Sequence, residues 1–350
     1  MKNKITNNFL EYLEYYKDYS FEDIHFNTID AAILGFLSYE PCMNLEDNST
    51  FTDLYNKCIS MSEEEIHGAM AYVTIDMLSV IKDALRYKDI RIFNIQKQVD
   101  SDIQFGAITF RWNNIAYVSY EGTSASMAGW VENFNLYAEY PTETQKLAIE
   151  YLNNTIKESD EIIYVGGHSK GGNLAMCSSM ETKDNIFDRI KTIYNLDGPG
   201  FREEEFNTDK FKKMNSKCIN ILPDGSMVGI LMNNSNYNFV EAQDISFKKH
   251  YPYNWKMFGE FFKKGEQNKA SKELQMQLSS NIDKVNMDDY KKLVMAFKNF
   301  FKENNLVTSH DFDDMTFTKL KDMFDEVKDV DPETRKRFFE MIKVLLFRGE

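Results

Sequence analysis

The segment EIIYVGGHSKGGNLA (161–175) contains the clearest chemical motif in the sequence, a G-x-S-x-G pattern at residues 167–171. In a nucleophile elbow of this kind the serine occupies a strained turn between a strand and a helix, and larger residues at the glycine positions would collide with neighbouring backbone. An apolar run precedes the motif and a helix-forming run follows it. We therefore predict that Ser169 is a nucleophile and that the N–H of Lys170 is an oxyanion donor.

A serine hydroxyl is a weak nucleophile, so it needs a base and usually an acid that orients the base. In elbow enzymes these follow in the order serine, acid, histidine. Two histidines lie downstream of the motif, His250 and His310. His250 follows the last predicted core strand and precedes a predicted helix, where a base belongs, so we prefer it to His310. We interpret His168 as a packing residue beside the nucleophile.

Three aspartates follow predicted core strands between the serine and His250: Asp197, Asp224 and Asp244. We prefer Asp224, because the acid loop usually follows the second strand after the nucleophile. Asp197 is the second choice, since its Asp-Gly-Pro-Gly context is also typical of a simple turn.

A second oxyanion donor is expected in the loop that follows residues 115–120. Gly122 lets the backbone approach a substrate oxygen, and Thr123 offers an N–H and a hydroxyl. The next stretch, SASMAGW, is rich in small residues and is compatible with a flexible lid or with an ordinary loop.

The elements that must position these residues alternate between strands and helices. Such alternation predicts an α/β fold with a mostly parallel central sheet. The expected elements are a β-hairpin at 103–122 that turns at Asn113–Asn114, helices at 141–157 and 171–183, and strands at 161–166, 191–196, 217–222 and 237–242.

The two ends of the chain are predicted to be helical. Residues 1–90 indicate helices with loops, including an apolar helical face in 27–39 and a helix within 63–87. Amphipathic helices are expected at 255–264, 269–283, 287–304, 313–328 and 332–348. We predict an α/β-hydrolase core over 1–255, N-terminal helices included, and a C-terminal helical extension or cap over 256–350.

Composition excludes several classes of protein. The chain has 350 residues, 43% of them hydrophobic and 14% aromatic, which disfavours intrinsic disorder. A formal net charge of −14 argues against a nucleic-acid groove. Four cysteines are too few for a disulfide scaffold, and no segment has the pattern of a secretory signal or a membrane span, so we expect a cytoplasmic protein. No HExxH, CxxC or GxGxxG motif occurs, so no metal or cofactor is implied.

Two segments resemble the class 3 (fungal-type) lipases: GHSKGGNLA is similar to their GHSLGG-x-LA elbow, and YEGTSASMAGWVENF to their F-R-G-T-x-S oxyanion loop. Residues 8–260 resemble a bacterial domain-of-unknown-function family with a lipase-like α/β-hydrolase core. Further hallmarks of that family are FLEYLEYYKDYSF, FNTIDAAILGFLSY, LDGPGF, LPDGSMVG, a late histidine followed by Trp255, and the Q-x-x-A-x-x-Y-L pattern of Gln145, Ala148, Tyr151 and Leu152.

The resemblance implies a nucleophile at Ser169, a base at His250 and oxyanion donors at Thr123 and Lys170. Glu121 departs from the lipase pattern, which usually has arginine at that position. The lipase acid position falls nearer Ser226 than Asp224, so Asp224 must reach in from two residues earlier; otherwise the site uses Asp197 or is a Ser–His dyad.

The implied function is a serine hydrolase that cleaves an ester or thioester. A small acyl ester is the first expectation for its substrate and a lipid the second. Two alternatives remain open on the sequence: a catalytically inactive binding or scaffolding protein with this fold, and an acyltransferase.

Overall fold

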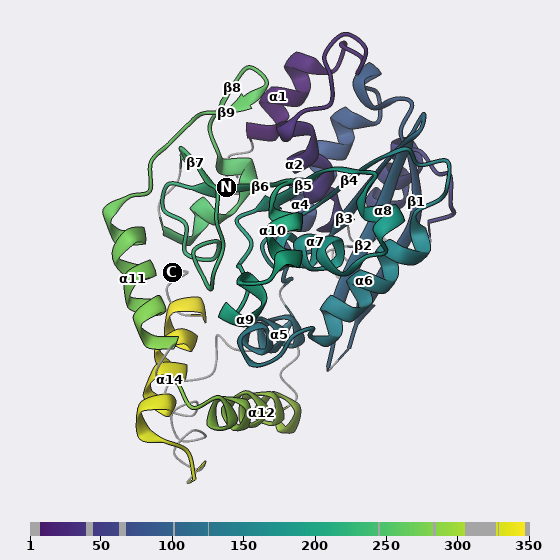
Figure 1. Cartoon of the computed structure of the whole chain (residues 1–350). Helices are drawn as coiled ribbons and strands as arrows, with labels where there is room; N and C mark the ends of the chain where they lie inside the picture. The colour runs from purple at the N-terminus through teal and green to yellow at the C-terminus, as the bar shows by residue number, and fades with distance from the viewer. Residues whose placement is uncertain are drawn as a thin grey trace.

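A seven-stranded sheet forms the centre of the molecule (Figure 1). The computed structural model describes residues 8–39, 45–62, 68–100, 102–124, 126–243, 246–282, 285–304, 327 and 329–346. In the sheet the strands stand in chain order, antiparallel from β1 to β3 and parallel from β3 to β7. They are β1 (Arg91–Val99), β2 (Gln104–Trp112), β3 (Ile115–Tyr120), β4 (Ile162–His168), β5 (Ile190–Leu196), β6 (Cys218–Pro223) and β7 (Tyr237–Val240). The predicted mostly parallel α/β fold is confirmed.

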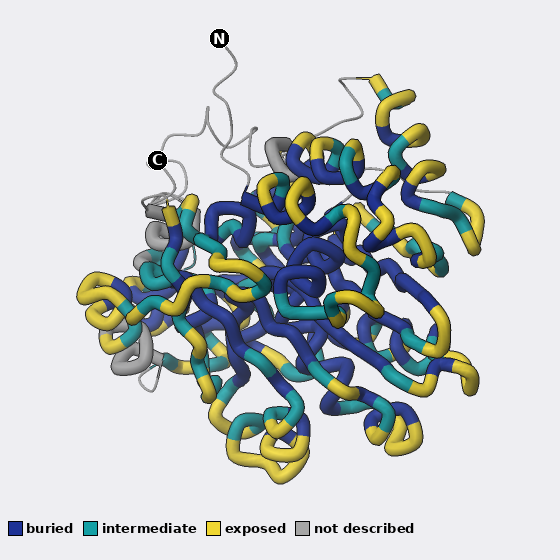
Figure 2. The backbone as a smooth tube through the Cα atoms, turned by 90° about the horizontal axis from the view of Figure 1, so that it is seen from above, coloured by how far each residue is buried: buried dark blue, intermediate teal, exposed yellow. Residues whose placement is uncertain are grey.

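The central strands are buried on both faces, which explains why their sequences are nearly continuous apolar runs. Figure 2 shows this buried centre, with exposed residues at the periphery. The predicted hairpin is confirmed: β2 and β3 pair antiparallel, and Asn113 turns the chain with a φ of 51°. Strand β1 extends the sheet beyond this hairpin and was not predicted, because its alternation is broken by Asn94, which has a φ of 53°.

Helices α6 (Glu143–Thr155), α7 (Lys170–Glu181) and α10 (Asp209–Asn215) cover one face of the sheet. Parallel strands joined in chain order by crossovers of the same right hand place their helices on the same side. Two short helices, α8 (Asp184–Phe187) and α9 (Glu203–Phe206), complete these crossovers.

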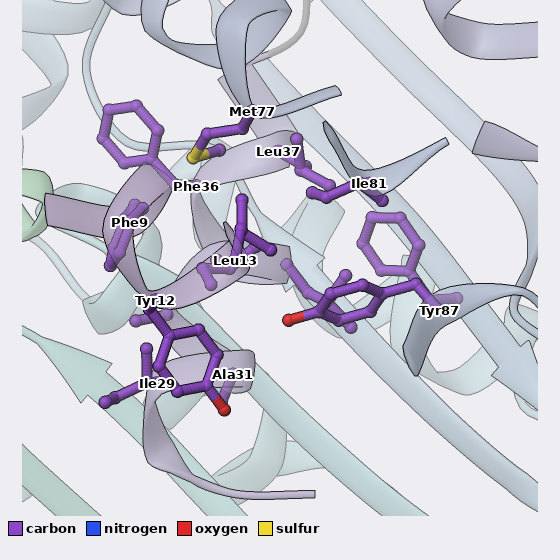
Figure 3. Close-up of a cluster of buried hydrophobic side chains, with 14 of the residues drawn as sticks. Phe9, Tyr12, Leu13, Ile29, Ala31, Phe36, Leu37, Met77, Ile81 and Tyr87 are labelled. Atoms are coloured by element: carbon purple, nitrogen blue, oxygen red, sulfur yellow. The ribbon is translucent and has the colours of Figure 1, made fainter. Parts of the chain in front are cut away.

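The opposite face is covered by the N-terminal region: α1 (Asn8–Tyr16), α2 (Thr28–Phe36), η1 (Leu37–Tyr39), α3 (Phe51–Ile59), α4 (Gly68–Ile81) and η2 (Leu85–Tyr87). Figure 3 shows their apolar side chains packed together, Phe9 and Leu13 of α1 among Phe36 and Met77. The predicted N-terminal helical region is therefore confirmed.

The C-terminal part carries helices α11 (Lys269–Ile282), α12 (Met287–Glu303) and α14 (Pro332–Leu346), as predicted. The predicted helix at 255–264 is wrong. That segment forms an antiparallel hairpin of β8 (Met257–Phe258) and β9 (Phe261–Phe262), because Gly259 adopts a φ of +61° and reverses the chain. The alternative base His310 and Asp244 lie outside the described residues, as does the predicted helix at 313–328 except for residue 327.

Helix α5 (Met127–Ala138) follows the predicted oxyanion loop and packs against α12 (Figure 1). A cluster of buried residues joins α5, α12 and α14, with Phe134 of α5 in contact with Phe297 and Phe338. The SASMAGW stretch is therefore largely the first turn of a packed helix, and the expectation of a flexible loop is wrong for residues 127–130. Across the described ranges, no helix combines the length and apolarity needed to span a membrane.

Candidate active site

Ser169 lies between β4 and α7 in a backbone conformation with φ 58° and ψ −130°, in the region that disfavours side chains. The flanking glycines allow this turn. A Cβ on Gly167 would lie 2.5 Å from the Gly171 backbone, and a Cβ on Gly171 would collide with the Tyr120 carbonyl. The motif therefore folds as the strained strand–turn–helix that its glycines predicted.

Asp197 leaves the neighbouring strand at the same edge of the sheet. His168 pairs with Leu196 in the β4–β5 register, and the N–H of Ser169 donates to the Leu196 carbonyl at 2.9 Å. Asp197 follows directly with a φ of 51°. Because parallel strands end together, the last residues of β4 and β5 bring Ser169 and Asp197 side by side.

His250 and Asp197 form a short buried pair. Nδ1 of His250 lies 2.6 Å from Oδ2 of Asp197. The other carboxylate oxygen, Oδ1, accepts from the Ser226 hydroxyl at 2.5 Å and from the Gly229 N–H at 3.0 Å. Asp197 is fully buried and His250 nearly so. His250 ends η3 (Ser246–His250), which is followed by η4 (Pro252–Asn254).

The contact predicted for Asp224 belongs instead to Asp197. The Asp224 carboxylate accepts a hydrogen bond from the Lys249 ammonium at 2.7 Å, and the main-chain N–H of Asp224 donates to the Val240 carbonyl. The acid beside the imidazole thus follows the first strand after the nucleophile and not the second. Ser226, near which the lipase acid position falls, contacts the same carboxylate from the loop after β6.

Burial shifts both members of the pair towards their neutral forms. It raises the pKa of the Asp197 carboxyl above its ordinary value, although the hydrogen bonds from Ser226 and Gly229 oppose that shift. It lowers the pKa of His250 below the ordinary histidine value of 6.5. The imidazole is therefore neutral at neutral pH, which is the form that can accept a proton.

The His250 ring also packs against the ring of His168, the residue before Ser169, with 4.4 Å between ring centroids. Position 250 is thus close to the elbow although it lies 82 residues from His168 in the chain. His168 is buried and has polar partners at both ring nitrogens: Nδ1 lies 3.0 Å from the Tyr39 hydroxyl and Nε2 lies 2.9 Å from the His250 carbonyl. Tyr39, the last residue of the predicted helical segment 27–39, was not predicted to belong to the site.

The predicted oxyanion loop adjoins the elbow. A Cβ on Gly122 would lie 2.5 Å from the His168 carbonyl and 3.1 Å from Cβ of Ser169, so a glycine is needed for this approach. Thr123 follows, and its hydroxyl exchanges hydrogen bonds with the Asn133 side chain of α5, at 3.1 and 3.0 Å. These hydrogen bonds connect the predicted oxyanion loop to helix α5.

The Lys170 side chain points away from solvent and binds Gln104. Its ammonium donates to the Gln104 carbonyl at 2.7 Å and to Oε1 at 3.0 Å, and Nε2 of Gln104 donates to the Gly122 carbonyl at 3.1 Å. Burial lowers the pKa of Lys170 to about 8. The residue after the nucleophile is therefore linked through Gln104 to the predicted oxyanion loop.

In the described part of the chain, no group of three or more His, Cys, Asp or Glu side chains is arranged to hold a metal ion.

The sequence model of the Mbeg1-like family matches residues 81–302, from the end of the N-terminal helices through α12. No curated protein and no solved structure matches the chain. The matched region includes Ser169, Asp197 and His250 and covers more than half of the sequence, so the chain belongs to the Mbeg1-like family.

Proposed function

We propose that the chain is a serine hydrolase that cleaves an ester or thioester through an acyl-enzyme on Ser169. Ser169 is the nucleophile, His250 the base and Asp197 the acid, in place of the Asp224 predicted from the sequence. The single observation that carries the proposal is the 2.6 Å contact of Asp197 with His250 beside a strained serine elbow. Membership of the Mbeg1-like family supports the broader class of lipase-like hydrolases.

The tautomer of His250 suits this role. When Nδ1–H donates to Asp197, Nε2 carries the lone pair and can take a proton. Proton transfer from the Ser169 hydroxyl to Nε2 accompanies formation of the bond between Oγ and the acyl carbon. The protonated imidazole then returns that proton to the departing alkoxide or thiolate as its bond to the acyl carbon breaks. Water, deprotonated by the same nitrogen, then attacks the acyl carbon. The bond from this carbon to Oγ breaks, the imidazolium returns the proton to Oγ, and the acid is released.

The proposed oxyanion donors are the main-chain N–H groups of Lys170 and Thr123. The N–H at the first residue of a helix has no acceptor within the helix, so that of Lys170 at the start of α7 is available for an oxyanion. Loss of one such donor typically costs about 100- to 1,000-fold in turnover. A small acyl ester is the proposed substrate and a lipid ester the second candidate.

A fluorophosphonate probe tests the proposal directly, because it reacts with activated serines. Wild-type protein should be labelled, Ser169→Ala should lose the label, and His250→Ala should lose most of it. Ser178→Ala is the matched control, since Ser178 is a buried serine on α7 whose hydroxyl donates to the Ala175 carbonyl. That variant should be labelled like the wild type.

The outcome of labelling separates the open alternatives. Folded wild-type protein that takes no label would contradict the hydrolase and favour an inactive scaffold. Labelled protein that releases product from p-nitrophenyl acetate only when an amine or alcohol acceptor is added would favour an acyltransferase.

A further inference from the structure

His168 and Tyr39 form a buried chain of hydrogen bonds that the proposed reaction does not use directly. Tyr39 ends η1 in the N-terminal region and lies outside the residues matched by the family. Both side chains are at most 5% exposed. These hydrogen bonds connect the Tyr39 hydroxyl to the His168 ring, and the His168 ring to the main-chain carbonyl of His250.

The chemistry of the two groups that contact His168 fixes which atom donates in each of these hydrogen bonds. A carbonyl oxygen can only accept, so Nε2 of His168 carries the proton and donates to the His250 carbonyl at 2.9 Å. Burial and the neighbouring His250 lower the pKa of His168 well below its ordinary value, so the ring is neutral and Nδ1 is an acceptor. The Tyr39 hydroxyl therefore donates to Nδ1 at 3.0 Å.

We infer that His168 is a positioning residue for His250, and that Tyr39 holds His168 in the tautomer that this task requires. The inference rests on the proposed function, since it concerns the residue assigned as the base. His168 acts on His250 in two ways: it binds the main-chain carbonyl and packs its ring 4.4 Å from the imidazole.

The tautomer matters because the alternative would repel the base. With the proton on Nδ1, the lone pair of Nε2 would face the lone pairs of the His250 carbonyl. The proton of the Tyr39 hydroxyl would also lose its acceptor at Nδ1. The buried hydrogen bond to the His250 carbonyl would be lost, and His168 would no longer hold His250 beside the elbow. A displacement of about 1 Å can cost about 100-fold in rate.

Four variants test the inference through turnover of p-nitrophenyl acetate. His168→Phe keeps a ring beside His250 but removes the donor, and it should lower kcat about 10- to 100-fold with little change in KM. His168→Gln supplies both a donor and an acceptor and should recover most of that loss. Tyr39→Phe should lower kcat about 10-fold. Tyr117→Phe is the matched control, since it removes a buried tyrosine hydroxyl that donates to the Ala31 carbonyl instead, and it should keep the wild-type kcat.

Nitrogen-15 NMR of the five histidines gives a readout that needs no turnover. In wild-type protein His168 should be protonated on Nε2 and His250 on Nδ1. Tyr39→Phe should mix the tautomers of His168 and shift the His250 ring signals, whereas Tyr117→Phe should change neither.

Several results would overturn the inference: wild-type kcat in His168→Phe, equal loss in the Phe and Gln variants, or a His168 tautomer unaffected by Tyr39→Phe. Wild-type protein without fluorophosphonate labelling or turnover would instead contradict the proposed function. The NMR spectra would still decide whether Tyr39 and His168 hold His250.

Discussion

The Asp197 carboxylate meets two opposing demands. It is fully buried, which disfavours a charge, yet it accepts hydrogen bonds from Ser226 and Gly229 and faces the His250 ring. Removing an ion from water costs several kcal/mol unless such partners replace the solvent. The hydrogen bonds from Ser226 and Gly229 to Oδ1 also fix the orientation of the carboxylate, so that Oδ2 faces the imidazole.

This orientation predicts unequal effects of two aspartate substitutions. Asp197→Asn should lower kcat by about three to four orders of magnitude, because an amide favours the wrong histidine tautomer. Asp224→Asn is the matched control and should leave kcat within about threefold, since Asp224 pairs with Lys249, a partly exposed contact of modest value. Steady-state hydrolysis of p-nitrophenyl acetate measures both. The reverse ranking would assign the acid to Asp224.

The pH dependence of the reaction should reflect burial of the imidazole. His250 accepts a proton only when neutral, so activity is lost as pH falls through its pKa. Burial lowers that pKa. The acid limb of kcat/KM should therefore have its midpoint below the ordinary histidine value of about 6.5. At higher pH kcat/KM should reach a plateau. A midpoint at or above 6.5 in a pH–rate profile would show that burial does not dominate.

At the scale of elements, α5 connects the proposed oxyanion loop to the C-terminal helices. Its Asn133 binds Thr123, and its Phe134 packs edge-on against Phe297 of α12 at 5.3 Å between ring centroids. Phe297 is fully buried. The C-terminal helices thus brace the helix that holds one side of the proposed site.

Truncation of this contact should destabilise the protein. Phe297→Ala should lower the free energy of unfolding by about 3–5 kcal/mol, because it leaves a cavity between α5, α12 and α14. Met295→Ala is the matched control on the same helix; Met295 is 56% exposed, so its loss should cost less than about 1 kcal/mol. Urea unfolding followed by circular dichroism compares the two. Similar values for both variants would mean that α12 does not brace α5.

At the scale of the whole molecule, the sequence predicted most of the central sheet and two of the helices that pack on it. The strands from β2 to β7 and the helices α6 and α7 were expected within a few residues, because strands of a parallel sheet are largely apolar runs between turn residues. Helices α5, α8, α9 and α10 were not predicted. The structure of the segment 255–264 was predicted wrongly, since its mixture of lysines and aromatics suits a helix or a hairpin, and only the left-handed Gly259 decides between them.

The site was predicted in part for a similar reason. The elbow motif lies within five consecutive residues, so the sequence alone indicates the position of the serine. The partner of His250 depends on which loops meet at the edge of the sheet, and Asp197 was placed second because its turn-forming context explained it without chemistry. Tyr39 was missed because its contact with His168 spans 129 residues and leaves no local pattern.

The agreement between strand order and chain order bears on biosynthesis. Each strand pairs with the one translated just before it, so the sheet can grow by successive addition while the chain leaves the ribosome. Ser169 emerges first, Asp197 next and His250 last. On the proposed function, a nascent chain would therefore carry a folded elbow without its base until the segment after β7 had been translated.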